Sequence, residues 1–92
     1  MSPRAARKIR SALAKKGFRE ERSHHLYFRL YVNGEKTGIC TYISHGAQEC
    51  DDYILGTMAK HLMLTKAQLC AFIDCTLSME AYIEILRGLG EI

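Results

Sequence analysis

Residues 24–32 decide the fold and read His-His-Leu-Tyr-Phe-Arg-Leu-Tyr-Val. The side chains in this stretch alternate with a period of two, which predicts a β-strand with two different faces. The apolar face carries Leu26, Phe28, Leu30 and Val32, and the other face carries His25, Tyr27, Arg29 and Tyr31. Because the apolar face must be covered by helices, the second face is expected to point away from the main core.

Turn and cap residues place the elements on either side of this strand. Asn33-Gly34 is typical of a tight hairpin, and it predicts a partner strand over about 37–43. A shorter strand is expected over about 18–22. Upstream, an apolar stripe at helical spacing predicts a helix over about 3–16, with Ser2-Pro3 as its N-terminal signal.

Three more helices are predicted in the second half of the chain. Asp51-Asp52 favour the start of a helix that reaches about residue 63. Thr65 and Gln68 have the spacing of a capping box, and Ser78 suits the N-cap of a last helix. The expected fold is α+β: helix, three strands and helix, followed by two further helices, all in one domain.

Composition limits the class of protein further. The chain of 92 residues suffices for one hydrophobic core, and it contains no apolar run of the ~20 residues that a membrane-spanning helix needs. The basic N-terminus lacks the apolar segment of a secretory signal, so we expect a cytoplasmic protein without membrane contact. The four cysteines show no CxxC spacing, and we expect reduced thiols, no metal and no cofactor.

Charge is distributed unevenly along the chain. The first 46 residues carry ten Lys and Arg against three Asp and Glu, a net charge of +7. The remaining residues carry three basic and seven acidic side chains, a net charge of −4. A basic half of this kind favours contact with a polyanion. The expected basic face of the first helix includes Arg4, Lys8 and Lys15, which are predicted to hold an RNA backbone.

The polar face of the central strand suggests RNA chemistry. Tyrosine rings such as Tyr27 and Tyr31 can stack on unpaired bases, and Arg29 can hold a phosphate. A histidine such as His25 can move a proton near neutral pH, and RNA supplies its own nucleophile in the 2′-hydroxyl. Alternating tyrosine and arginine is also ordinary on a half-exposed sheet, so a surface without function is the alternative.

The other histidines are expected to have structural or solvent-exposed positions. His24 falls on the apolar side of the alternation, which predicts a buried or edge position with a backbone hydrogen bond. His45 lies in a predicted loop, where a turn or helix-cap role is expected, and it remains a candidate RNA contact. His61 falls on the exposed side of the predicted second helix and is expected to be solvated.

Several short motifs resemble one known family. Residues 23–29 read Ser-His-His-Leu-Tyr-Phe-Arg and follow a basic helix that ends in Lys16-Gly17-Phe18. Residues 42–46 (Tyr-Ile-Ser-His-Gly) and 58–64 (Met-Ala-Lys-His-Leu-Met-Leu) follow in the expected order. Over about residues 5–64 the chain resembles the HicA toxins, small RNA-cleaving partners of bacterial toxin–antitoxin pairs.

The resemblance implies a core over 1–64 like the double-stranded-RNA-binding domain, and metal-independent cleavage of messenger RNA by a histidine. Strand alternation favours His25 for that role, and His24 is the second candidate because it directly follows the serine. An antitoxin protein is the implied partner. The chain departs from the family pattern at Arg22, at Ser44 and in the added C-terminal helices of residues 65–92.

Three functions from different classes follow. The first is an endoribonuclease of the toxin type, a messenger-RNA interferase. The second is a non-catalytic RNA-binding module of the same fold. The third is a protein–protein module, in which the C-terminal helices form a homodimer and the basic surface meets an acidic partner. These helices could instead cover the open sheet face or replace part of an antitoxin contact.

Overall fold

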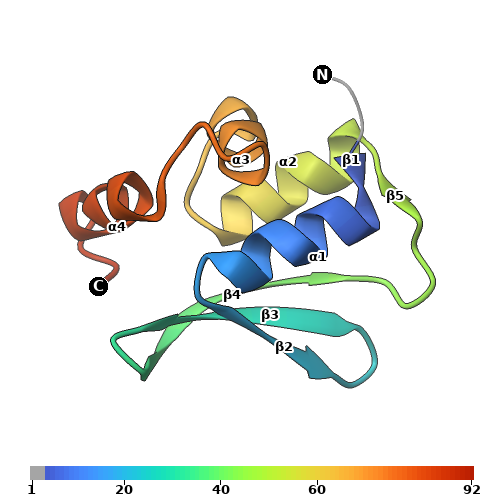
Figure 1. Ribbon diagram of the computed structural model, residues 1–92, viewed down its shortest axis with the longest axis horizontal. Helices are drawn as coiled ribbons and strands as arrows, with labels where there is room; N and C mark the ends of the chain where they lie inside the picture. The colour runs from blue at the N-terminus through green and yellow to red at the C-terminus, as the bar shows by residue number, and fades with distance from the viewer. Residues whose placement is uncertain (1–3) are drawn as a thin grey trace.

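The computed structural model describes residues 4–92 and shows an α+β fold with a three-stranded antiparallel sheet and four helices (Figure 1). The main sheet has the strand order β2-β3-β4, and β1 pairs with β5 in a separate small sheet. The elements are β1 (Arg4–Ala5), α1 (Ala6–Lys15), β2 (Phe18–Arg22), β3 (Leu26–Val32), β4 (Glu35–Ile43), β5 (Glu49–Cys50), α2 (Asp52–His61), α3 (Lys66–Ile73) and α4 (Met79–Gly88). The predicted order of the main elements is confirmed.

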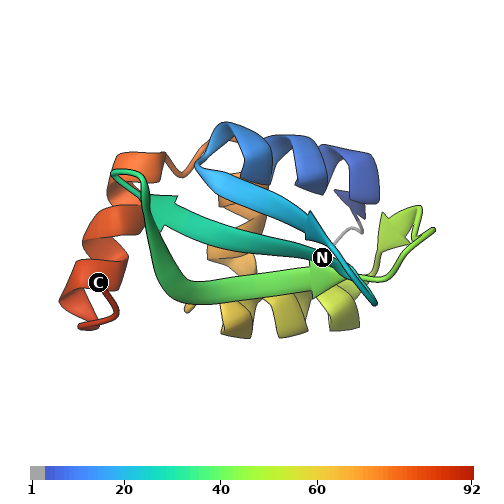
Figure 2. The same cartoon turned by 90° about the horizontal axis from the view of Figure 1, so that it is seen from below.

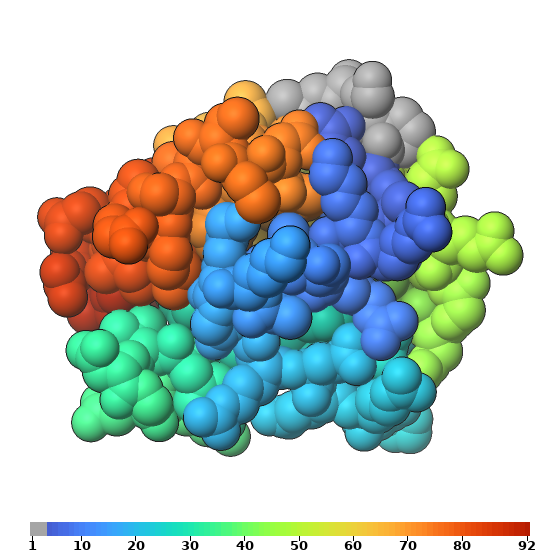
Figure 3. All heavy atoms as spheres, viewed as in Figure 1, coloured from blue at the N-terminus to red at the C-terminus, as the bar shows by residue number. Residues whose placement is uncertain are grey.

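The helices lie on one side of the main sheet. Figure 1 shows α1, α2 and α3 above the sheet and α4 beside its end. From below, in Figure 2, the three strands lie in front of the helices, and no described helix covers them. Helix α3 packs against α1 and α2, and Figure 3 shows its side chains against those of α1. Covering the open face of the sheet is therefore not a role of the C-terminal helices.

The alternation predicted for the central strand is confirmed. Leu26, Phe28 and Leu30 are buried on the helix side, with exposed fractions of 7%, 1% and 0%. Tyr27 and Arg29, which point the other way, are half-buried. The period of two thus assigns each side chain of β3 to a packed face or to an open face.

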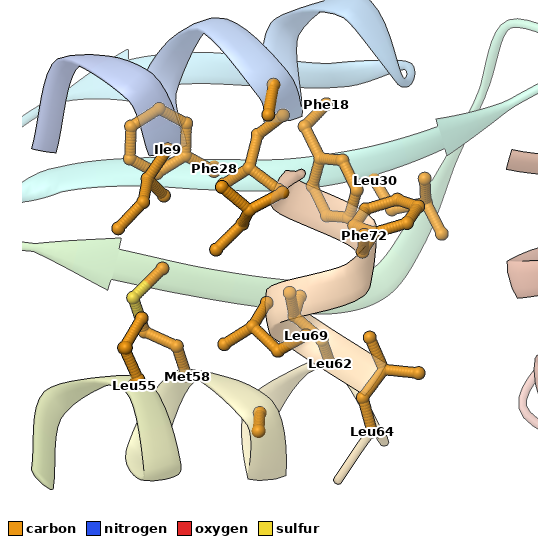
Figure 4. Packing of buried hydrophobic residues seen from close by; sticks show 14 of the residues in the cluster. Ile9, Phe18, Phe28, Leu30, Leu55, Met58, Leu62, Leu64, Leu69 and Phe72 are labelled. Atoms are coloured by element: carbon orange, nitrogen blue, oxygen red, sulfur yellow. The ribbon is translucent and has the colours of Figure 1, made fainter. Parts of the chain in front are cut away.

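One hydrophobic cluster joins the sheet to all four helices, and Figure 4 shows the part of it that lies between the sheet and helices α1, α2 and α3. Phe18 of β2, Phe72 of α3 and Tyr82 of α4 bring their rings to within 4.7–6.3 Å of one another. The hydroxyl of Tyr82 donates a hydrogen bond of 2.9 Å to the carbonyl of Leu62, and burial raises the pKa of Tyr82. These contacts anchor the C-terminal helix to the end of the sheet.

Two turns depend on left-handed backbone geometry. Asn33 and Gly34 have φ values of 53° and 79°, as a two-residue hairpin between right-twisted strands requires. Strand β4 consequently begins at Glu35, two residues earlier than predicted. Gly17 has φ +86°, and a Cβ there would lie 3.3 Å from the carbonyl oxygen of Tyr31, so a side chain would be strained on both counts.

The helix caps expected downstream are confirmed. The Asp51 side chain accepts a hydrogen bond of 2.9 Å from the Ile54 amide and opens α2. Thr65 and Gln68 make both bonds of the capping box at the start of α3. Ser78 accepts from the amide of Ala81 and opens α4, as a hydroxyl N-cap does. None of the helices in residues 4–92 combines the length and apolarity needed to cross a bilayer.

The start of the first helix differs from the prediction. Helix α1 begins at Ala6 rather than near residue 3, because Arg4 and Ala5 are extended and pair with Cys50 and Glu49. The amide of Ala6 donates to the carbonyl of Gln48 at 2.9 Å. Pairing with β5 thus satisfies backbone groups that a side-chain cap would otherwise satisfy. The predicted start at Ser2-Pro3 lies outside the described residues.

Candidate nucleic-acid interface

A histidine turn joins β2 to β3. The pairing of the two strands closes at Arg22 and Leu26, and the amide of Ser23 donates to the carbonyl of His25 at 3.0 Å. The strand predicted over 24–32 therefore begins at Leu26. His24 lies in the turn and is exposed, so the expected buried or edge position is wrong, since the alternation ends where the pairing closes.

His25 belongs to a group of stacked rings on the open face. Its imidazole stacks on Tyr42 at 4.9 Å between centroids and lies 6.0 Å from Tyr27. Tyr27 and Tyr42 are direct cross-strand partners, with ring centroids 5.7 Å apart. The Nδ1 atom of His25 is buried without a hydrogen-bond partner in the described chain, so this ring is held by packing alone.

His61 extends this group across the edge of the sheet. Its Nδ1 lies 3.1 Å from the hydroxyl of Thr41, which is fully buried. Its ring lies 5.5 Å from that of Tyr42. The expected solvated position of His61 is wrong, because the last turn of α2 packs against β4. His25, Tyr27, Tyr42 and His61 are hereafter called the ring cluster.

His45 anchors the histidine turn from the loop that follows β4. Its Nε2 lies 2.8 Å from the carbonyl oxygen of Ser23, and since a carbonyl only accepts, Nε2 carries the proton in this bond. The predicted position of His45 in a loop is confirmed, but its hydrogen bond holds a turn that is distant in sequence, which was not predicted. His24, His25 and His45 are thus brought to one end of the sheet.

Two arginines face each other on the open face. Arg19 of β2 and Arg29 of β3 are direct partners across the strands. The Arg19 guanidinium lies 4.0 Å from the centroid of the Tyr31 ring. Nη1 of Arg29 donates to the carbonyl of Thr37 at 3.2 Å, and its Nε is buried with no partner among the described residues. Like charges directly opposite each other destabilise a sheet. The stability of the fold therefore does not explain this pair, whereas binding of an anionic ligand would.

Acidic charge on the open face is limited. Glu21 lies two residues after Arg19 on β2, opposite Tyr27, and makes no ion pair within the described chain. Glu20, by contrast, points to the helix side and accepts two bonds from Arg10, at 2.8 and 3.2 Å. The bidentate pair fixes β2 to α1, and Glu20 adds no negative charge to the open face.

A cavity of about 430 Å³ lies beside the histidine turn. It is open to solvent and is bounded by the first turns of α1, the start of β3 and the loop after β4, and Arg7 and Arg10 line it together with Leu26 and Ile43. Arg7 is exposed and makes no ion pair in the part of the chain that is described. Arg7 therefore adds positive charge beside the histidine turn, whereas the charge of Arg10 is balanced by Glu20.

The predicted contacts on the first helix lie elsewhere. Arg4 and Lys8 both bind the carboxylate of Asp74 at 2.9 Å, and these bonds lower the pKa of Asp74. Lys15 is exposed at the end of α1. Helix α1 lies on the covered side of the sheet (Figures 1 and 2), whereas Tyr27 points to the open face. The structure brings His25, Tyr27, Arg29 and Tyr31 together and separates Arg4, Lys8 and Lys15 from them.

The cysteines are free thiols in different environments. Cys50 and Cys70 are buried, and burial raises the pKa of Cys50. Cys40 is half-buried, and the exposed Cys75 has its Sγ 3.1 Å from Nζ of Lys16. Across residues 4–92, no group of three His, Cys, Asp or Glu side chains is placed to hold a metal ion.

No family model matches the chain, and no characterised protein or solved structure shows significant similarity to it. Tyr42 and His61 are the additions that sequence reasoning missed. Tyr42 could not be found from the hairpin turn alone, because the register that pairs Val32 with Glu35 shifts between Tyr31 and Arg29. Only this shift brings Tyr42 opposite Tyr27.

Proposed function

We propose that the protein is an RNA-binding endoribonuclease that uses histidine acid/base chemistry without a metal. The observation that carries this proposal is the position of His25 within stacked tyrosines on a sheet face that no described helix covers. The opposed guanidiniums of Arg19 and Arg29 lie on the same face. Rings for bases, cations for phosphates and a titratable imidazole are the components that RNA cleavage requires.

The chemistry follows from the substrate. A base removes the proton of the 2′-hydroxyl, and the 2′-oxygen attacks the adjacent phosphorus. An acid protonates the departing 5′-oxygen, so that a 2′,3′-cyclic phosphate and a 5′-hydroxyl form. Guanidiniums stabilise the charge that develops on the phosphorane oxygens. Arg29, which is held by the carbonyl of Thr37, is proposed for this role, while Tyr27 and Tyr31 stack on bases.

Two histidines compete for the proton transfer. His25 is preferred because its ring is fixed on the open face beside Tyr27. His24 is the second candidate, since it is exposed in the turn and free to approach a bound phosphate. His45 is assigned a positioning role, because its bond to Ser23 fixes the turn that carries both.

The resemblance to the HicA toxins supports this proposal independently of the geometry. It extends the proposal to a core like the double-stranded-RNA-binding domain, a messenger-RNA substrate, a cytoplasmic location and an antitoxin protein as partner. An antitoxin of this kind would have to cover the histidine turn or the open face to block cleavage. A gene for such a protein beside the gene for this chain would support the assignment.

The test is cleavage of a labelled messenger RNA by the purified protein in the presence of EDTA. His25→Phe keeps a ring in the stack but removes both nitrogens, and His24→Gln changes the turn as little as possible. We expect one of them to lose at least about 100-fold in rate, the lower range of a positioned acid or base, while RNA affinity is retained. Products should end in 2′,3′-cyclic phosphate.

Leu89→Ala is the matched control, because Leu89 is exposed on the C-terminal helix end, away from the histidine turn. Undiminished cleavage in the variant that lacks both His24 and His25 would contradict the proposal.

A non-catalytic RNA-binding module is the second candidate. It is favoured by one observation: no described residue hydrogen-bonds the His24 or His25 ring to fix its tautomer. Binding without cleavage by the wild type would establish it.

A further inference from the structure

A small pocket lies where β4 meets α2, next to the ring cluster. Its volume is about 210 Å³, below the ~300–1,000 Å³ of sites for drug-sized ligands. Tyr42 and Ser44 line it from the strand side, and Tyr53, Thr57 and His61 line it from α2. The pocket therefore suits a single flat ring system with a polar edge, rather than a larger ligand.

Aromatic groups occupy both walls of this pocket. Tyr53 is 82% exposed, the highest value among the large apolar side chains of the described chain, and it is not part of the core. Tyr42 is 40% exposed, and one side of its ring is stacked on His25. Tyr53 is absent from the hydrophobic core, so packing does not account for an aromatic ring at the rim of this pocket, whereas a stacking ligand would bury it.

The polar groups at the pocket are suited to the edge of a base. His61 uses Nδ1 toward the hydroxyl of Thr41, which leaves its Nε2 for another partner. The hydroxyl of Thr57 donates to the carbonyl of Tyr53 and can still accept, and the hydroxyl of Ser44 is exposed. Apolar side chains of Ile43, Ile54 and Met58 complete the lining. This combination of flat apolar walls and a few hydrogen-bonding groups is typical of base recognition in single-stranded RNA.

We infer that the pocket between β4 and α2 binds one unpaired nucleobase of the RNA, stacked against Tyr42 and Tyr53 and contacted at its edge by His61. The inference rests on the proposed function and deepens it, because it defines the substrate as single-stranded. A base within a duplex cannot enter such a pocket without leaving its stack. The ring cluster connects this pocket to His25, so the bound base would lie a short distance from the scissile phosphate.

The first measurement is an NMR titration of the full chain with AMP, GMP, CMP and UMP, which requires no cleavage. We expect saturable shifts of the ring resonances of Tyr42, Tyr53 and His61 with at least one nucleotide. The second uses fluorescence anisotropy with a short single-stranded RNA made uncleavable by 2′-O-methylation. Tyr53→Ala should raise its Kd about 5- to 100-fold, the range of one lost stacking contact. Tyr53→Phe should stay within about twofold of wild type, and Leu89→Ala is the control for loss of an exposed apolar side chain.

The outcomes separate this inference from the proposed function. Cleavage of RNA by a protein whose pocket resonances never move, and whose affinity is unchanged in Tyr53→Ala, would overturn the pocket and leave the ribonuclease standing. Shifts of the pocket resonances without cleavage of any RNA would support the base-binding pocket and contradict the ribonuclease activity. Equal or tighter binding of a matched duplex would also overturn the pocket. Because Tyr53 is so exposed, its replacement should leave the fold intact, and the melting temperature checks this.

Discussion

The two sides of the main sheet differ in what satisfies their side chains. On the helix side, Phe28 and Leu30 are buried in a continuous core, and Arg10 is paired with Glu20. On the open side, the rings are half-exposed, and the guanidinium of Arg19 faces that of Arg29. One strand, β3, supplies both sides within the same seven residues.

The difference indicates that folding explains the side chains of one face and that ligand binding explains those of the other. The helix side is explained by folding alone, since its apolar groups are buried and its polar groups have partners. The open side retains two buried nitrogens without partners, on His25 and Arg29, and a like-charge pair that costs stability. A ligand that brings flat rings and negative charge would remove these costs, and RNA brings both.

The largest effect expected is on the helix side. Phe28→Ala removes a side chain that is 1% exposed at the centre of the core, and such truncations cost about 3–5 kcal/mol. The free energy of unfolding of a domain of this size is only about 5–15 kcal/mol. Urea unfolding of the variant should therefore show a protein that is only marginally stable. A loss below 1 kcal/mol would mean that the core is not packed as described.

Replacement of Tyr27, the residue before Phe28, should affect RNA binding rather than stability. Tyr27→Ala on the open face should leave the free energy of unfolding within about 1 kcal/mol of wild type, in keeping with its partial exposure. Its affinity for single-stranded RNA should fall by about 1–3 kcal/mol through the lost stacking contact. Urea melts and anisotropy titrations on the same samples measure both. If Tyr27→Ala unfolds the protein instead, the two faces are not distinct.

A smaller effect is expected for charge on the open face. Arg19→Gln removes one of the two opposed guanidiniums and the cation above the Tyr31 ring. If Arg19 contacts a phosphate, the slope of log K against log salt should become less negative by about 0.7, the value for one contact to a single strand. Lys66→Gln is a suitable comparison, because Lys66 is already paired with Asp52 on α2. An equal change of slope in both variants would remove the special role of this face.

The smallest effect concerns the paired charges of the helix layer and depends on pH. Arg4 and Lys8 lower the pKa of Asp74 below the ordinary value of 3.8, so the ionised carboxylate stabilises the fold. This contribution is complete above about pH 5 and is lost as the pH falls through the folded pKa. Asp74→Asn should lower the Tm at pH 7 by no more than about 5 °C, as for exposed ion pairs. The difference from wild type should shrink as the pH is lowered below 3.8, which thermal melts across pH would show.

Local signals in the sequence predicted the elements that depend on neighbouring residues. The caps at Thr65 and Ser78, the Asn33-Gly34 hairpin and the two faces of β3 all follow from interactions within a few positions. The start of α1 did not, because Arg4 and Ala5 pair with residues 49 and 50, far along the chain. A capping signal cannot reveal a competing strand that is distant in sequence.

The candidate site was likewise predictable only where its residues are neighbours in sequence. His25, Tyr27, Arg29 and Tyr31 were recognisable because one strand carries them. The remainder of the ring cluster comes from β4 and α2, and His61 was misplaced because its own helix gave no sign that β4 lies against it. Likewise, the role of Asp74 in binding Arg4 was hidden, since the two are separated by 70 positions. Sequence therefore indicates the chemistry of one strand, and tertiary packing completes the site.

Strand β2 forms one edge of the main sheet, and its residues 19–22 read Arg-Glu-Glu-Arg. The free backbone groups of an edge strand can pair with another copy of the chain, which is a common route to aggregation. This tetrapeptide is a palindrome, so antiparallel pairing with itself in full register would place arginine against arginine and glutamate against glutamate. In-register parallel pairing would do the same, and like charges directly opposite repel. The charge pattern of β2 therefore opposes pairing of this edge strand with a second copy of the chain.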